Sequence, residues 1–245
     1  MIKKKTKLGI IGYGSWGKKI FDRLKKNKEV EIIFVEKTKK KYSKLYHEAD
    51  WIYIATPIDT HFRIVKKFLL LKLNVFCEKP LSFNKKQLSS LYNLAKKNKK
   101  VLFVNHIEFF KLKKKKITIK KNNLIENYFK INVSYLESFE RFLYHDFYIL
   151  YGMIKKKYYN LKFINKQNTF ELVFRQKFSI QKIKSSLIKH KIRVHKVNGI
   201  NFVTKKDYIN DYFNSIFSYK EDIDLNRKQV FFASHIFNSF KKLTN

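Results

Sequence analysis

The stretch that most constrains the fold is rich in glycine and lies close to the N-terminus. An apolar run is followed there by the spacing Gly-x-Gly-x-x-Gly over residues 12–17, and then by a segment with helical periodicity. Four of the six glycines of the chain belong to this stretch: Gly9, Gly12, Gly14 and Gly17. Glycine at such positions permits a tight turn, the close approach of a pyrophosphate to the backbone, and close packing of helix on strand. The pattern predicts a strand, a turn and a helix whose first N–H groups favour a diphosphate.

A carboxylate at the end of the next apolar run supports a dinucleotide site. Residues 30–35 are typical of a buried strand, and Glu36 follows them, 24 residues after Gly12. This is close to the spacing at which an acidic side chain accepts hydrogen bonds from an adenosine ribose. Taken alone, the glycine spacing also serves turns that only pack, and a strand-end charge is often merely solvated. Together they predict a dinucleotide site that includes Gly12, Gly14, Ser15, Trp16, Gly17 and Glu36.

The first hundred residues alternate between strand-like and helix-like segments. Further strands are expected at residues 51–55, 74–77 and 101–104, and helices at 18–28, 59–72 and 82–97, with a short one before Asp50. Such alternation with right-handed crossovers gives a parallel sheet that helices cover on both faces. The sequence therefore predicts an α/β fold, with a doubly wound Rossmann dinucleotide-binding domain over residues 1–105.

Residues 106–245 follow a different pattern. Strands are expected at 128–133, 170–174, 178–187 and 191–197, a hairpin turn at Asn198-Gly199, and helices at 143–151, 208–217 and 229–243. Successive strands joined by short turns favour antiparallel pairing. We therefore predict a smaller α+β domain with an open, mostly antiparallel sheet, which includes the C-terminal helices and serves substrate binding and oligomerisation.

The net charge of the chain is +36, which would attract nucleic acid or anionic surfaces. The lysines are spread through every segment, however, and residues with A/T-rich codons are abundant while glycine and proline are scarce. We interpret the basicity as a bias of genome composition, and we do not expect nucleic acid as a partner. The densest lysine run, residues 111–116, is interpreted as a solvated loop.

Other features of the sequence limit the cellular compartment and the kinds of site that we expect. The single cysteine, Cys77, excludes an intramolecular disulfide and fits a reducing compartment, so we expect a cytoplasmic protein. No apolar run approaches the ~18–20 residues of a membrane span, so no membrane partner is expected. His190 and His195 have no cysteine or carboxylate at metal-binding spacing, and the sequence predicts no metal site.

Three motifs in combination resemble the Gfo/Idh/MocA oxidoreductase family. They are the glycine motif, Ala55-Thr56-Pro57 with His61, and Glu78-Lys79-Pro80-Leu81. Trp16-Gly17-Lys18 and His145-Asp146 look most like the branch that acts on nucleotide-linked or other sugars. The resemblance implies a Rossmann domain coupled to an open-sheet domain, in a shortened form. It also implies hydride transfer between NAD or NADP and a sugar, polyol or nucleotide sugar, and a homo-oligomer formed through the second sheet.

The resemblance also implies roles for single residues. Lys79 would hydrogen-bond a substrate hydroxyl and help to move its proton, and Glu78 beside it would position or neutralise the amine. His145 would be the acid–base partner, and Asp146 would orient it or bind a hydroxyl. On the cofactor side the family motifs add Ala55, Thr56, Pro57, His61 and Glu78.

Some points of this resemblance stay open. Glu36 favours NAD because it would repel a 2′-phosphate, whereas Lys37, Lys39 and Lys40 would offset that repulsion and admit NADP. Much of the family has Asp four residues before the second-domain histidine, where this chain has Arg141. Either the adjacent Glu140 substitutes, or the proton relay is altered. The alternatives to an active dehydrogenase are a dinucleotide-binding protein that has lost catalysis, and a basic binder of nucleic acid or anionic surfaces.

Overall fold

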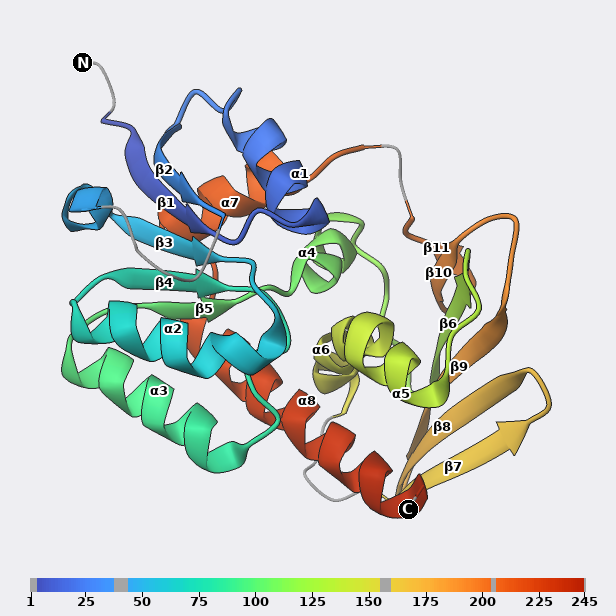
Figure 1. The fold of residues 1–245 in the computed structure, drawn as a ribbon. Coiled ribbons are helices and arrows are strands. Elements are labelled where there is room, and N and C mark those ends of the chain that lie inside the picture. The colour runs from blue at the N-terminus through green and yellow to red at the C-terminus, as the bar shows by residue number, and fades with distance from the viewer. Residues whose placement is uncertain (1–3, 38–43, 155–159, 204–205, 245) are drawn as a thin grey trace. The chain divides into compact units, whose positions relative to one another are not determined.

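The chain folds into two compact units in the computed structural model, which describes residues 4–37, 44–154, 160–203 and 206–244 (Figure 1). Unit 1 consists of Met1–Asn105 and Tyr208–Ser234. Unit 2 consists of His106–Asp207 and His235–Asn245. This division differs from the expected boundary, because residues 208–234 pack with the N-terminal part of the chain.

Unit 1 is built on a five-stranded parallel sheet, as the strand–helix alternation predicts. The strand order is β2-β1-β3-β4-β5. The strands are β1 (Thr6–Ile11), β2 (Val30–Glu36), β3 (Trp51–Ile54), β4 (Asn74–Cys77) and β5 (Leu102–Val104). Every residue of β3 is buried, which explains why this strand is continuously apolar rather than alternating. The chain adds β2 on one side of β1 and the later strands on the other side. In open α/β sheets ligands bind at the carboxyl ends of the strands at this point.

Helices cover both faces of this sheet. They are α1 (Ser15–Leu24), the short η1 (Lys44–Glu48), α2 (Ile58–Leu70), α3 (Lys85–Lys97), α7 (Ile209–Phe217) and the first part of α8 (Ile223–Thr244). Figure 1 shows α2 and α3 side by side, and α1 packs against α7. The side chain of Asn84 caps α3 by accepting from the backbone N–H groups of Lys86 and Gln87.

The aromatic face of α7 explains why residues 208–234 belong to unit 1. The ring of Phe213 lies 5.2 Å from that of Tyr53, and the ring of Phe217 lies 5.3 Å from that of Trp51. These buried rings fill the sheet face opposite α2 and α3, and so complete the core of unit 1. The sequence shows that α7 has an apolar face, but not which sheet that face covers.

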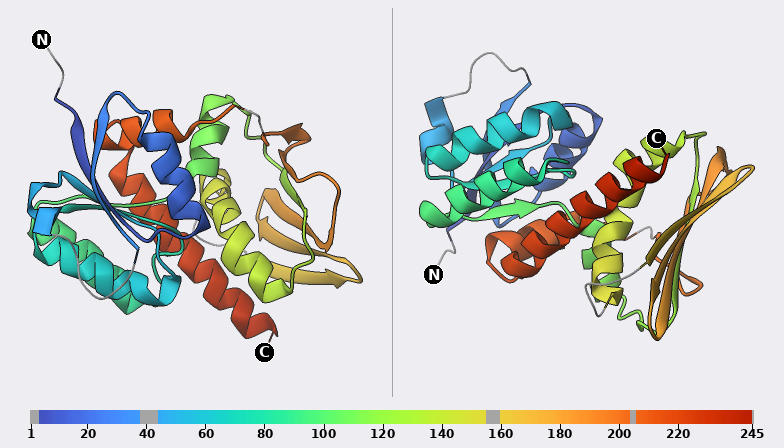
Figure 2. Two further views of the ribbon diagram at one scale, coloured as in Figure 1. Left: turned by 45° about the horizontal axis from the view of Figure 1, so that its top comes forward. Right: turned by 90° about the horizontal axis from the view of Figure 1, so that it is seen from below.

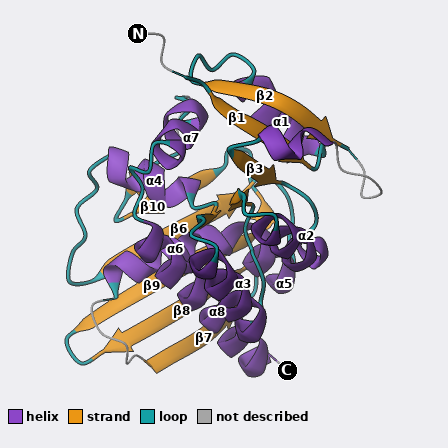
Figure 3. Cartoon of the chain, turned by 90° about the vertical axis from the view of Figure 1, so that its left-hand side faces the viewer, coloured by secondary structure: helices purple, strands orange, loops and turns teal. Residues whose placement is uncertain are grey.

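Unit 2 contains a six-stranded sheet of order β11-β10-β6-β9-β8-β7 (Figure 3). Its strands are β6 (Asn123–Phe129), β7 (Asn160–Lys166), β8 (Thr169–Gln176), β9 (Ser179–Lys189), β10 (Val194–Val197) and β11 (Ile200–Asn201). All pairings are antiparallel except β6 with β9, so the mostly antiparallel sheet is confirmed. Asn198-Gly199 joins β10 to β11 with both residues at positive φ, as a tight hairpin turn requires.

The helices of unit 2 are α4 (Ile107–Lys114), α5 (Tyr135–Glu137), the π-helix η2 (Ser138–Leu143), α6 (Tyr144–Met153) and the end of α8. The right-hand view of Figure 2 shows this sheet nearly on edge, with α6 and the end of α8 on one face. The interpretation of residues 111–116 as a loop is wrong, because most of them form the last turn of α4. Buried Phe110 and Leu112 hold that turn in place. Among the described helices, none has both the length and the apolar character that crossing a membrane requires.

Candidate active site

A pocket of about 320 Å³ lies at the carboxyl ends of β1, β2 and β3 in unit 1. It brings together segments that the sequence analysis singled out separately: the glycine turn, the end of β2, and the turn after β3. Its lining residues are Ile11, Gly12, Tyr13, Gly14, Ser15, Trp16, Glu36, Lys37, Ala55, Thr56, Pro57 and Ile64. Of the residues expected on the cofactor side, Gly17, His61 and Glu78 lie outside this lining.

The glycines of the turn differ in whether a side chain would fit at their positions. Gly12 has φ +100°, and a Cβ there would lie 2.5 Å from the carbonyl oxygen of Ala55. A Cβ on Gly17 would lie 2.1 Å from the carbonyl oxygen of Gly12. The protein's own packing therefore requires glycine at both positions. A Cβ on Gly14 would meet nothing within 4 Å. The space above Gly14 is therefore free for a ligand, and the loop fits the diphosphate of a dinucleotide.

The start of α1 suits an anion. Gly14 is its N-cap and provides no side-chain hydrogen bond, and the first turn carries no acidic residue. Ser15 and Trp16 of this turn line the pocket. A helix start without an acidic side chain keeps its partial positive charge available to a bound phosphate.

Two residues of opposite charge border the other end of the pocket. The backbone carbonyl of Glu36 accepts a hydrogen bond from the N–H of Gly12 at 2.9 Å, which fixes the end of β2 beside the glycine turn. The Lys37 ammonium lies 5.3 Å from the ring centre of Tyr13, a cation–π separation. Lys39 and Lys40, which were considered for the choice between NAD and NADP, lie outside the described residues.

Glu78 is held by three donors from different parts of unit 1. Its Oε1 accepts from Trp16 Nε1 at 2.6 Å, from Asn105 Nδ2 at 2.6 Å, and from the Tyr53 hydroxyl. Burial and the charge of Glu78 raise the pKa of Tyr53 well above its usual range, so this hydroxyl remains a donor. The carboxylate thus ties α1 and β3 to the chain segment that ends in half-buried Lys79.

His61 connects two of the strand-end motifs. Its Nδ1 lies 2.7 Å from the carbonyl oxygen of Pro80, and its Nε2 lies 2.7 Å from that of Thr56. Burial lowers the pKa of His61, so the neutral ring donates to one of these carbonyls at a time. The ring is 1% exposed and joins the turn after β3 to the peptide that follows Lys79.

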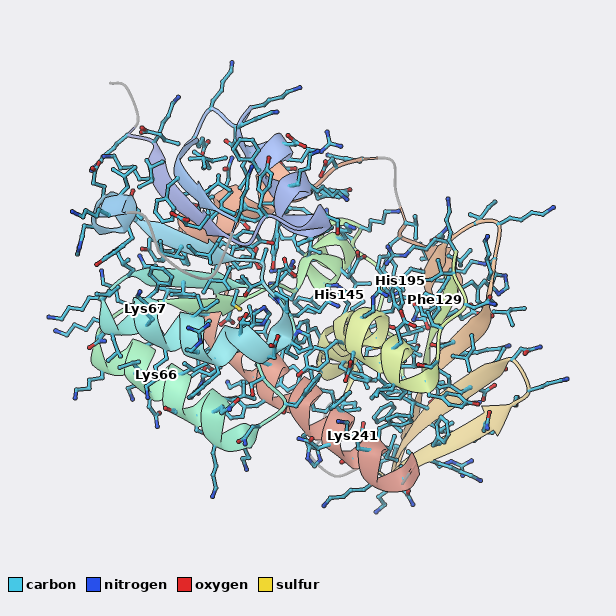
Figure 4. The ribbon with its side chains drawn as sticks, in the orientation of Figure 1. Lys66, Lys67, Phe129, His145, His195 and Lys241 are labelled. Atoms are coloured by element: carbon cyan, nitrogen blue, oxygen red, sulfur yellow. The ribbon has the colours of Figure 1, made fainter. Side chains whose placement is uncertain are left out.

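Unit 2 contains a buried polar cluster around Asp146, which is fully buried on α6. The two oxygens of Asp146 accept from His195 Nε2 and from Asn127 Nδ2, each at 2.5 Å. On its other side, His195 Nδ1 lies 3.7 Å from Glu108 Oε2, an ion-pair distance and too long for a hydrogen bond. Glu108 Oε1 in turn accepts from Lys111 Nζ at 2.9 Å. Figure 4 labels His195, which comes from β10, and His145, which comes from α6.

Neighbouring charges favour the charged forms of His195 and Glu108 despite their burial. Burial disfavours the imidazolium, but the carboxylates of Asp146 and Glu108 outweigh it and raise the pKa of His195 above its usual value. Burial likewise disfavours the Glu108 carboxylate, but His195, Lys111 and His145 hold the pKa of Glu108 well below its usual range. The two carboxylates therefore favour the protonated form of His195 despite its burial.

His145 is the second residue of α6, which begins directly after the π-helix η2, a type of segment that is frequent at functional sites. The side chain of Arg141 is 61% exposed and forms an ion pair with Glu137. Glu140 is half-buried. Of the three residues expected to be catalytic, Lys79 lies in unit 1, whereas His145 and Asp146 lie in unit 2.

The sequence analysis missed several members of these two clusters. Tyr53 and Asn105 support Glu78, Asn127 and His195 bond Asp146, and Glu108 lies beside His195. A tyrosine inside an otherwise apolar strand was one available signal, since a buried hydroxyl needs a partner. His195 had no such signal, because its partner Asp146 is 49 residues away in the chain.

Comparison with known proteins relates part of unit 1 to a family of oxidoreductases. Residues 19–106 match the sequence profile of a family described as "Oxidoreductase family, NAD-binding Rossmann fold". The uncharacterized oxidoreductase YgjR of Escherichia coli (strain K12) is 43% identical over 54 residues. That match spans 22% of this chain and only 16% of the length of YgjR.

Solved structures share the fold over nearly the whole chain. UDP-N-acetylglucosamine 3-dehydrogenase GnnA from Acidithiobacillus ferrooxidans superposes with a TM-score of 0.80 at 11% identity, covering 96% of each chain. GenD2 from gentamicin A biosynthesis, solved in complex with NAD, gives a TM-score of 0.74 at 10% identity, covering 97% of this chain and 93% of its own. At such identities the likeness shows the fold alone. The profile match over residues 19–106, less than half of the chain, agrees with the resemblance of this segment to the Gfo/Idh/MocA oxidoreductase family.

Proposed function

We propose that the protein is an NAD(P)-dependent oxidoreductase. It transfers a hydride between a nicotinamide and a hydroxyl- or keto-bearing carbon of a sugar, polyol or nucleotide sugar. The observation that supports this most is that the glycine turn, Glu36 and Ala55-Thr56-Pro57 line one pocket, with open space above Gly14. The names of two proteins of the same fold support the substrate class and the cofactor: GnnA is a UDP-N-acetylglucosamine 3-dehydrogenase, and GenD2 was solved with NAD.

We assign the cofactor contacts to unit 1. Gly12, Gly14 and the first turn of α1 would hold the diphosphate, and Glu36 would accept from the adenosine ribose. Glu36 favours NAD, while the ammonium of Lys37 beside it leaves NADP open. His61 and Glu78 would support the pocket from behind, because their polar atoms bond to protein groups. The bound nicotinamide would supply the hydride chemistry.

The proton would be moved by this chain's own residues. Lys79 would hydrogen-bond the reacting hydroxyl, and His145 would be the acid–base group, since an imidazole titrates near neutral pH. Glu78, fixed by three donors, would set the position of Lys79. Asp146 would orient His145 rather than touch substrate, because it is fully buried and both its oxygens are bonded. Unit 2 would supply most substrate contacts, and its sheet would form the homo-oligomer.

A panel of sugars, polyols and nucleotide sugars, screened with NAD and NADP for the absorbance of the reduced nicotinamide, tests this proposal. Once a substrate is found, Lys79→Ala should lower kcat by about 100-fold or more while the dinucleotide affinity is kept. Exposed Lys86 on α3 offers a matched control, and Lys86→Ala should keep wild-type turnover. Unchanged turnover in Lys79→Ala would refute the assigned role of Lys79.

A second function is favoured by one observation. The family's acidic position is occupied by Arg141, which is exposed and pairs with Glu137. This supports a dinucleotide-binding protein of the same family that has lost catalysis. Tight NAD binding without turnover of any compound in the panel is the outcome this alternative predicts, and substrate-dependent reduction of NAD would exclude it.

A further inference from the structure

We propose that His195 is a positioning residue: with Asn127 it fixes Asp146, and thereby sets the orientation of His145 in the same turn of α6. The inference rests on the proposed function, in which His145 is the acid–base group. Its basis is a set of contacts that lie entirely inside unit 2.

The two residues that hold Asp146 are neighbours in the sheet. His195 and Asn127 lie directly opposite each other in the antiparallel pairing of β10 with β6. Both side chains are buried on the same face, where buried and partly exposed residues alternate along each strand. Each of them donates to a different oxygen of Asp146, so the carboxylate group cannot rotate without breaking a hydrogen bond. The helix is therefore fastened to the sheet at the residue next to His145.

A third group completes the arrangement from another helix. Glu108, in the first turn of α4, lies on the side of His195 that faces away from Asp146. The imidazole ring thus links α4, α6 and β10 at one point. The charged groups that surround it are Asp146 and Glu108, and Glu108 also interacts with Lys111 and with His145.

Packing alone would not require these charges. Apolar residues of similar volume often hold a core as well as a buried ion pair does, or better. What hydrogen bonds add is direction, because they fix the angle of a side chain as well as its depth. Direction matters here, because His145 follows the π-helix η2, where the helical register departs from that of a regular α-helix. The hydrogen bonds of Asp146 fix the position of the helical turn that carries His145 relative to the sheet.

Two substitutions separate positioning from bulk packing. His195→Ala removes the donor and should lower kcat by about 100-fold, the size of effect expected when a reacting group is displaced by about 1 Å. His195→Gln keeps a side-chain amide that donates to Asp146 and should recover at least about tenfold of that loss. In both variants the affinity for NAD should stay within about twofold, because the pocket lies in unit 1. His190→Gln is the matched control, since His190 bonds Ser186 and stacks on Tyr128, outside the cluster.

The NMR titration of the His145 imidazole gives a readout that does not depend on turnover. Its signal is assigned with His145→Gln, and its midpoint should shift in His195→Gln but not in His190→Gln. A shifted midpoint in a protein that turns over no compound would leave the positioning role standing and overturn the proposed function. An unchanged midpoint, or unchanged kcat in an active protein, would overturn the positioning role. If His195→Ala does not fold, Asn127→Ala removes one of the two bonds to Asp146, and the same outcomes decide.

Discussion

Each unit holds a carboxylate beside a candidate catalytic residue, but the two carboxylates are held by different chemistry. Glu78, next to Lys79, receives its bonds from an indole, a phenol and an amide, all of which are neutral. Asp146, next to His145, is bonded by one amide and by the imidazole of His195, whose protonated form the neighbouring carboxylates favour. Neutral donors hold an anion without a second charge, whereas a buried cation holds it only while the cation keeps its proton. The support of His145 is therefore expected to be more sensitive to mutation and to pH than the support of Lys79.

The largest expected difference is between amide substitutions of these two carboxylates. Asp146→Asn should lower the free energy of unfolding by about 3–5 kcal/mol, because it leaves buried His195 without its closest counter-charge. Glu78→Gln keeps a carbonyl oxygen for the same neutral donors and should cost only about 1 kcal/mol. Urea unfolding of both variants measures this contrast. Equal losses would show that the two carboxylates are held in equivalent ways.

The next difference is in pH dependence. The pKa of His195 is raised above 6.5 in the folded protein, so the stabilisation it provides is complete below pH 6.5 and is lost as pH rises through the folded value. The pKa of Glu108 is lowered below 4.5, so its stabilisation is present above pH 4.5 and is lost as pH falls. The cluster should therefore stabilise the protein most between these two values.

Urea unfolding of wild type and His195→Gln over a pH series measures this effect. The stability advantage of wild type should shrink above pH 6.5, with a slope of at most about 1.4 kcal/mol per pH unit. His190→Gln provides the reference for other titrating groups. A wild-type advantage that is constant with pH would mean that His195 does not hold its proton in the fold.

The smallest expected effect is at Arg141. Its ion pair with Glu137 is exposed, so Arg141→Ala should change the free energy of unfolding by less than about 0.5 kcal/mol. Thermal unfolding with and without added salt checks this prediction. A loss of more than about 1 kcal/mol would show that the pair is part of the structure that holds η2 and α6.

Local signals in the sequence were sufficient to predict much of the fold and of the pocket of unit 1. Glycines spaced for a turn, a carboxylate after the second strand, and Thr56-Pro57 after the third each stand at the end of a strand. In a parallel sheet those ends meet at one edge, so their position in the sequence already places them together. The antiparallel character of the second sheet also followed from its short turns, including Asn198-Gly199.

The remaining features depend on contacts between distant segments. The side chains that bond Asp146 come from strands on either side of α6 in the chain, and only the pairing of β6 with β10 brings them together. Composition also misled, because the lysines of residues 111–116 concealed the buried apolar residues that make α4 a helix. Similarly, the apolar face of α7 fits either sheet by pattern, and the rings of Trp51 and Tyr53 decide which one it covers.

The central claim is that the glycine turn of unit 1 binds a dinucleotide, and Gly14 allows the most direct test. Because a Cβ on Gly14 meets no protein atom within 4 Å, Gly14→Val should still fold, with only the small loss of stability that valine causes at the N-cap of α1, while its side chain occupies the space of the diphosphate. Gly152→Ala in unit 2, where a Cβ makes an ordinary 3.6 Å contact, is the control. Calorimetric titrations with NAD and with NADP should show that at least one of them binds to wild type and Gly152→Ala, with a loss of about 100-fold or more in that affinity for Gly14→Val. Equal affinity for wild type and Gly14→Val, or binding of neither dinucleotide by wild type, would contradict the claim.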